Sequence, residues 1–258
     1  MKKMLLSLLC SVVVSTAAAQ TAEEKGLQIA KDADAYDTGF VDFTAEMVMV
    51  LRNRKGEEST RTIRSRTLEV SGDGDKSMSI FDEPADVRGT AMLTFSHGLE
   101  PDDQWLYLPA LKRVKRIASR NKSGPFMGSE FAFEDLGSQE VEKYSYKFLR
   151  EEKCGDSWEC NVVERFPQYE HSGYTRQIVW ADKDDFRIAK VEYYDRKDTL
   201  LKTLVMKDYS QHLDHYWRPG VMEMENHQTG KSTILKWNNY QFKTGLSDRD
   251  FHHSKLQS

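Results

Sequence analysis

The sequence of 258 residues carries 37 Lys and Arg against 41 Asp and Glu, which gives a formal net charge of −4. This acidic balance argues against binding to bulk nucleic acid, and the length suits one large β domain. Beyond the first segment, no stretch approaches the roughly 20 apolar residues that a membrane-spanning helix requires.

The first segment, residues 1–19, predicts a cleavable secretory signal peptide. Two lysines give it a positive start, a short apolar run follows, and the alanines at 17–19 offer the small residues that a signal peptidase needs. Cys10 lies too early for lipidation, and the residue before it is a bulky leucine. We therefore expect residues 20–258 to form one domain that is free in the periplasm and not lipidated.

Residues 22–36 predict the only long helix of the mature chain, because apolar residues recur there at helical spacing. These are Leu27, Ile29, Ala30, Ala33 and Tyr36. From Phe43 to Met49 the period changes to two, and similar segments continue to residue 242, separated by turns such as 72–75. One opening helix followed by antiparallel strands predicts a mainly β domain built on a single curved sheet or barrel.

The mature chain retains two cysteines, Cys154 and Cys160, with five residues between them. In an oxidising compartment two such cysteines pair, and the Gly155-Asp156 turn between them makes a hairpin plausible. A redox role would require Cys-x-x-Cys, which is absent. The sequence therefore predicts a structural disulfide.

Residues 122–137 differ from the predicted strands because they are rich in glycine and apolar residues without a period of two. The apolar members are Phe126, Met127, Phe131, Phe133 and Leu136. These side chains are too apolar to lie in water, so the segment is expected to cover an apolar cavity. Two alternatives remain open: a plug over the protein's own core, or a lid over a ligand site.

A basic stretch in this acidic protein forms a local positive patch. Its members are Lys112, Arg113, Lys115, Arg116, Arg120 and Lys122. Such a patch is suited to anionic headgroups or an acidic partner surface. The alternative is a solvated edge strand whose charges prevent edge-to-edge aggregation.

Motifs for catalysis are absent from the sequence. There is no Gly-x-Ser-x-Gly elbow, no His-Glu-x-x-His, no phosphate-binding glycine loop and no Cys/His metal spacing. His212 and His215 would face opposite ways on a strand, which argues against a shared metal. We expect a protein that is not an enzyme and that has no catalytic residue, metal or cofactor.

A series of sequence motifs extends along the mature chain and comprises residues 89–93, 105–117, 126–131, 134–136, 191–195, 222–226 and 246–251. The most specific block begins Trp-Leu-Tyr-Leu-Pro at Trp105. This series resembles the LolA-like family of outer-membrane lipoprotein-sorting proteins. The resemblance implies an unclosed antiparallel β-barrel of about 11 strands around helices that act as a lid. It also implies an apolar interior that accepts acyl chains.

The function implied by this resemblance is a periplasmic carrier or chaperone that moves lipids or lipoproteins towards the outer membrane. The alternative is a lipid-sensing or regulatory module on the same barrel. Expected partners are acyl chains, with an inner-membrane exporter of the resistance-nodulation-division type or a lipoprotein-release complex, and no nucleic acid. Methionine is an adaptable lining residue, although Met47, Met49, Met92, Met206, Met222 and Met224 could equally be ordinary core. The candidate lipid-binding residues are Phe43, Met47, Met49, Met92, Trp105, Tyr107, Phe126, Met127, Phe131, Phe133 and Leu136.

Overall fold

The structure is a computed structural model that describes residues 20–155 and 158–257. The expected signal peptide at 1–19 lies outside these residues, as does Asp156 of the predicted hairpin turn. The described chain contains thirteen strands, about two more than the sequence predicted. They are β1 (Asp42–Arg52), β2 (Glu58–Leu68), β3 (Lys76–Glu83), β4 (Ala91–Phe95), β5 (Asp103–Leu108), β6 (Arg113–Arg116), β7 (Tyr144–Lys153), β8 (Glu159–Pro167), β9 (Tyr174–Asp182), β10 (Ile188–Asp195), β11 (Leu200–His212), β12 (Tyr216–Asn226) and β13 (Lys231–Phe242).

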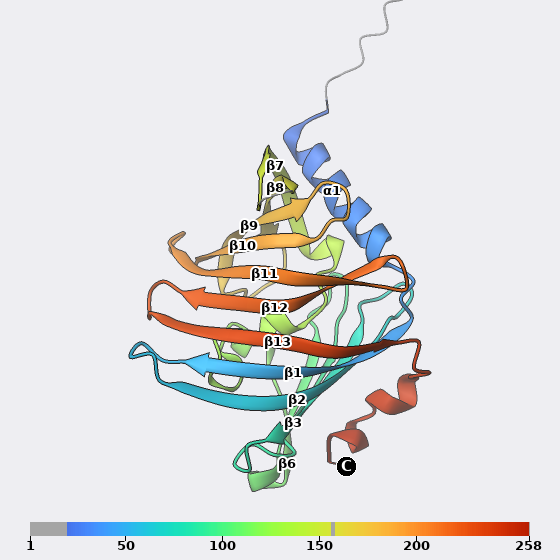
Figure 1. Cartoon of the computed structure of the whole chain (residues 1–258), viewed down its shortest axis with the longest axis vertical. Coiled ribbons are helices and arrows are strands. Elements are labelled where there is room, and N and C mark those ends of the chain that lie inside the picture. Colours follow the sequence, from blue (N-terminus) through green and yellow to red (C-terminus); the bar gives the residue numbers. More distant parts are fainter. Residues whose placement is uncertain (1–19, 156–157, 258) are drawn as a thin grey trace, which may run out of the picture.

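All thirteen strands belong to one antiparallel sheet in the order β6-β5-β4-β3-β2-β1-β13-β12-β11-β10-β9-β8-β7. Strand β1 pairs with β13, so the first and last strands meet in the middle of the sheet. The edge strands β6 and β7 lie at opposite ends of the strongly curved sheet (Figure 1). The sheet is therefore an unclosed barrel, as predicted.

The opening helix α1 (Ala22–Asp37) matches the predicted helix at 22–36. Thr21 begins it with a capping box: its Oγ1 accepts a hydrogen bond from the Glu24 N–H at 3.1 Å, and the Thr21 N–H donates to the Glu24 carboxylate at 2.9 Å. Gly26 lets the helix approach edge strand β7 closely, because a Cβ there would lie 2.8 Å from the Phe148 backbone nitrogen. The helix thus covers one end of the sheet (Figure 1).

The inner face of the sheet holds the main apolar core. Met47 and Met49 of β1 point inward and are less than 5% exposed. They pack with Ile63, Phe81, Met92, Leu204, Met224 and Leu235 from the neighbouring strands. None of the helices in the described part of the chain is long and apolar enough to cross a membrane.

The outer face of β3, β4 and β5 is covered by the C-terminal segment. Two short 3-10 helices, η6 (Asp248–Phe251) and η7 (His253–Gln257), place Phe251 and Leu256 against Leu93, and both are 2% exposed or less. The buried carboxylate of Asp42 fixes the start of this segment by accepting the Thr244 N–H at 2.7 Å. The structure therefore has two apolar layers, one on each face of the sheet.

Candidate functional site

A cavity of about 1570 Å³ lies between α1 and the inner face of the sheet. Met206 on β11 and Met222 on β12 pair directly across the two strands and contribute to one wall. The apolar part of the lining comes from α1, from the start of β1 and the loop before it, and from strands β2 and β8 to β12. Its members include Ile29, Ala30, Ala33, Phe40, Phe43, Leu68, Val163, Val179, Ala181, Ile188, Met206, Tyr209, Trp217 and Met222.

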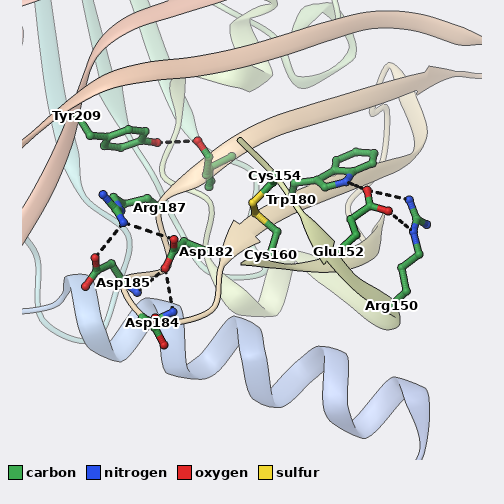
Figure 2. Close-up of a disulfide and its surroundings, with 11 residues drawn as sticks. Arg150, Glu152, Cys154, Cys160, Trp180, Asp182, Asp184, Asp185, Arg187 and Tyr209 are labelled. Carbon is green, nitrogen blue, oxygen red and sulfur yellow. Dashed lines mark hydrogen bonds and ion pairs between the residues drawn. A yellow bond between two sulfur atoms is a disulfide. The ribbon is translucent and has the colours of Figure 1, made fainter. Parts of the chain in front are cut away.

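One side of the cavity wall is fixed by Arg187. Its guanidinium lies 4.0 Å from the ring centroid of Trp158 and 4.5 Å from that of Trp217. Figure 2 shows the same group between Asp182 and Asp185, with ion pairs of 3.4 and 3.1 Å. These contacts hold Arg187 in the cavity wall, where its Nε is buried without a hydrogen-bond partner.

The rim of the cavity carries several carboxylates that belong to different elements. Asp75 is the most perturbed of them: burial, with Glu140 and Glu69 nearby, raises its pKa to about 7. Glu69 is held in place because its carboxylate accepts the backbone N–H groups of Gly39 and Val41. The rim is therefore acidic around an apolar interior.

We expect Asp75→Asn to flatten the pH dependence of stability between about pH 4 and pH 7. Asp75 binds a proton more tightly in the folded chain than in the unfolded chain, so folding loses stability as the pH rises through this window. The amide cannot ionise, so the variant keeps its stability as the pH rises. Thermal unfolding midpoints at pH 5 and pH 8 measure this effect, and an equal fall for both proteins would contradict it.

The apolar segment 126–136 fills the inner face of the sheet beside the cavity. It contains two 3-10 turns, η3 (Phe126–Gly128) and η4 (Phe133–Leu136). Phe126 and Phe131 are 2% and 3% exposed within the main core. The rings of Phe126 and Phe133 meet edge to face at 5.7 Å. Only the end of the segment, from Leu136 onward, reaches the cavity wall.

Buried polar contacts fasten this segment to the sheet. The Lys202 ammonium from β11 lies 2.7 Å from the Asp135 carboxylate and donates to the Glu130 carbonyl oxygen at 2.8 Å. The Tyr174 hydroxyl donates to the same carboxylate at 2.9 Å. Glu134 accepts the Gly173 N–H at 2.8 Å, and burial raises the pKa of its carboxyl. These contacts favour a plug, one of the two alternatives that the sequence left open.

Comparison with known proteins identifies relatives over nearly the whole chain. A family model described as an uncharacterized protein matches residues 73–258. A solved Vibrio parahaemolyticus domain, assigned as an outer-membrane lipoprotein-sorting protein, is 55% identical, with a TM-score of 0.89, over 92% of this chain and all of that one. A DUF1329 family protein from Desulfovibrio piger is 33% identical over the same shares, with a TM-score of 0.86. The chain belongs to the LolA-like family.

A more distant structure agrees with this assignment at the level of the fold. A LolA superfamily protein from Nitrosomonas europaea is 21% identical, with a TM-score of 0.70, over 89% of this chain and 99% of that one. None of the curated proteins compared matches the chain. The assignment of the chain to its family therefore rests on the Vibrio and Desulfovibrio structures, and the Nitrosomonas structure supports the fold alone.

The LolA-like structure separates the eleven candidate lipid-binding residues into three groups. Phe43 and Leu136 line the cavity. Seven others belong to the inner core or pack against it, namely Met47, Met49, Met92, Phe126, Met127, Phe131 and Phe133. Trp105 and Tyr107 lie on the outer face beneath the C-terminal segment, so their prediction as cavity residues was wrong. Trp105 and Tyr107 are two residues apart on β5 and share a face, but alternation alone does not show which face of the sheet this is.

Several cavity residues of this LolA-like protein were missed by sequence reasoning. Ile29, Ala30 and Ala33 were recognised as one face of a helix, yet nothing in the sequence showed that this face lines a cavity. Val179 and Ala181 alternate on β9, which could have identified them as inward-facing. Met206 and Met222, which the sequence offered as adaptable lining residues, do line the cavity.

The basic stretch lies at the β6 edge of the sheet, as the edge-strand alternative requires. Lys112, Arg113, Lys115, Arg116 and Arg120 are exposed. Lys122 is 9% exposed, and its ammonium donates to the Asp102 carbonyl oxygen, so it does not belong to the patch. Burial also lowers the pKa of Lys122. No group of three metal-ligating side chains lies close together in the described chain.

The predicted disulfide between Cys154 and Cys160 is present, with Cα atoms 5.7 Å apart (Figure 2). It joins the end of β7 to the start of β8, beside the apolar cluster around Trp180. Thiol labelling of the exported, denatured protein should find no free cysteine, and Cys154→Ser with Cys160→Ser should cost about 2–3 kcal/mol. Full labelling of both cysteines would contradict this pairing.

Proposed function

We propose that this LolA-like protein is a periplasmic carrier that holds the acyl chains of a lipid or lipoprotein in the cavity between α1 and the sheet. The cavity of about 1570 Å³ is the observation that supports the proposal. It exceeds the roughly 300–1,000 Å³ of ordinary small-molecule sites. Each methylene group transferred out of water contributes about 0.8 kcal/mol, so an apolar cavity can offset much of the cost of removing a lipid from a membrane.

Two observations support transfer towards the outer membrane. The Vibrio domain is assigned to outer-membrane lipoprotein sorting, and the N-terminal segment of this chain has the features of an export signal. Cargo would be received from an inner-membrane exporter or lipoprotein-release complex and carried towards the outer membrane. In this scheme the segment 126–136 contacts cargo only through Leu136, its one residue in the cavity wall.

Substitutions on the two sides of α1 test the role of the cavity. Ala33 is half-buried and lines the cavity, whereas Ala35 is exposed on the same helix. We expect Ala33→Trp to weaken binding of a fluorescent fatty-acyl probe at least about tenfold, because the indole occupies the space of the chain. Ala35→Trp is the matched control and should bind as wild type does. Equal binding by both variants would overturn the proposal.

A further inference from the structure

The hairpin between β5 and β6 presents an exposed apolar tip. The chain turns through a 3-10 turn, η1 (Pro109–Leu111), and reverses at Lys112, whose φ of 46° is left-handed and whose N–H donates to the Pro109 carbonyl oxygen. Ala110 is exposed, and Leu111 is 68% exposed, the most of any large apolar side chain in the described chain. In Figure 1 this end of the sheet projects away from α1. The tip therefore places a leucine in water at the far end of the molecule.

Cations without ion-pair partners follow this leucine in the chain. Lys112, Arg113, Lys115 and Arg120 are exposed, and none of them forms an ion pair with any residue that the structure describes. Arg116 differs, because its guanidinium pairs with Asp103. We call Leu111 and the four unpaired cations the basic tip. Its charges are free to meet an external anion.

Protection of the sheet edge accounts for only part of the basic tip. Strand β6 has four residues and two unpaired cations, and short, charged edge strands discourage pairing with another sheet. That purpose does not require an exposed leucine beside the strand. An exposed leucine next to Lys and Arg is instead typical of segments that lie at a lipid interface, where the apolar group enters the boundary and the cations meet phosphates.

We propose that the basic tip docks on an anionic phospholipid surface, with Leu111 entering the interface and the cations contacting lipid phosphates. An acidic protein partner fits less well, because a specific protein interface buries about 800 Å² on each side around apolar anchors. The basic tip offers one large apolar side chain. This inference concerns the docking surface and goes beyond the proposed cargo.

The position of the basic tip connects docking to the cavity. A smaller cavity of about 620 Å³ is lined by residues 116–119, which begin at the last residue of β6, and by His97 and Glu100. These last two residues also line the main cavity. The chain that leaves β6 therefore adjoins the rim of the cargo site.

Vesicle binding by the purified exported chain tests the docking surface. We expect binding to vesicles of about one-third phosphatidylglycerol in phosphatidylcholine, and none to phosphatidylcholine alone. Arg113→Glu with Lys115→Glu should weaken it about 20-fold or more, since each cation near such a surface contributes about a factor of five. The matched control reverses Arg54 and Lys55, exposed in the β1–β2 turn, to Glu and should bind as wild type does. Raised salt should mimic the first variant.

A second pair of variants tests the leucine itself. Leu111→Ser should weaken binding about fivefold or more, whereas Leu213→Ser, at the exposed turn after β11, should not change it. Absence of binding to the anionic vesicles at low salt would overturn the proposal. So would equal losses in the two charge-reversal pairs, or binding that survives both Leu111→Ser and the reversal of Arg113 and Lys115.

The two proposals can fail separately. The docking variants should take up a soluble fatty-acyl probe as wild type does, because the basic tip lies outside the cargo cavity. Wild-type protein that binds vesicles but no acyl probe would overturn the carrier function and leave the docking surface standing. Wild-type protein that binds the probe but no anionic vesicle would overturn the docking surface and leave the carrier function standing.

Discussion

Replacing Lys202 with methionine is expected to lower the free energy of unfolding by about 3–5 kcal/mol. Lys202 is 3% exposed, and its ammonium lies 2.7 Å from the Asp135 carboxylate. Methionine has a similar volume but leaves that carboxylate buried without its cation. The loss of a partner inside the protein costs far more than the loss of a surface ion pair. Urea unfolding at pH 7 measures the change.

Two further variants separate this effect from a general loss of charge. Lys207→Met removes an exposed ion pair with Glu223 from the same strand, β11, and should cost about 1 kcal/mol or less. Asp135→Asn added to Lys202→Met should recover part of the stability, because the buried negative charge is then gone. A Lys202→Met protein as stable as the Lys207→Met protein would show that the segment 126–136 is not fastened through this pair.

Replacing both Phe131 and Phe133 with alanine is expected to destabilise the protein by more than about 4 kcal/mol. Replacing one fully buried phenylalanine with alanine typically lowers the free energy of unfolding by about 3–5 kcal/mol. Phe131 is 3% exposed in the main core, and the partly buried Phe133 packs edge to face on Phe126. A plug predicts this loss, because the rings complete the core. Chemical unfolding gives the magnitude.

The same double variant distinguishes the plug from a lid. A lid predicts a variant that stays as stable as wild type but takes up less fatty-acyl probe, since the closed state loses its apolar contacts. A plug predicts lost stability as the primary effect. Wild-type stability with reduced probe uptake would therefore contradict the plug and favour a mobile cover.

Much of the fold follows from local patterns in the sequence. The helical spacing from Leu27 to Tyr36 predicts α1 correctly, and the alternation from Phe43 to Met49 predicts β1. The number of strands was underestimated by about two. The family motifs around Trp105 predicted the open barrel, which the structure confirms.

The site was less predictable because it depends on tertiary placement. Alternation cannot show that the outer face under Trp105 is covered by Phe251 from the C-terminal segment. A run of basic residues cannot show that Lys122 turns inward to a backbone carbonyl. The cavity wall on α1 forms only when Gly26 brings the helix against β7, a contact between residues far apart in the chain.

Mass spectrometry of lipids extracted from the purified exported protein tests the carrier function most directly. The cavity predicts acyl lipids in near-stoichiometric amounts from wild type and from Ala35→Trp, which leaves the cavity unfilled. Ala33→Trp, which fills it, should yield little or none. Equal amounts of lipid from both tryptophan variants, or no acyl lipid from wild type, would contradict an acyl-binding function for this cavity.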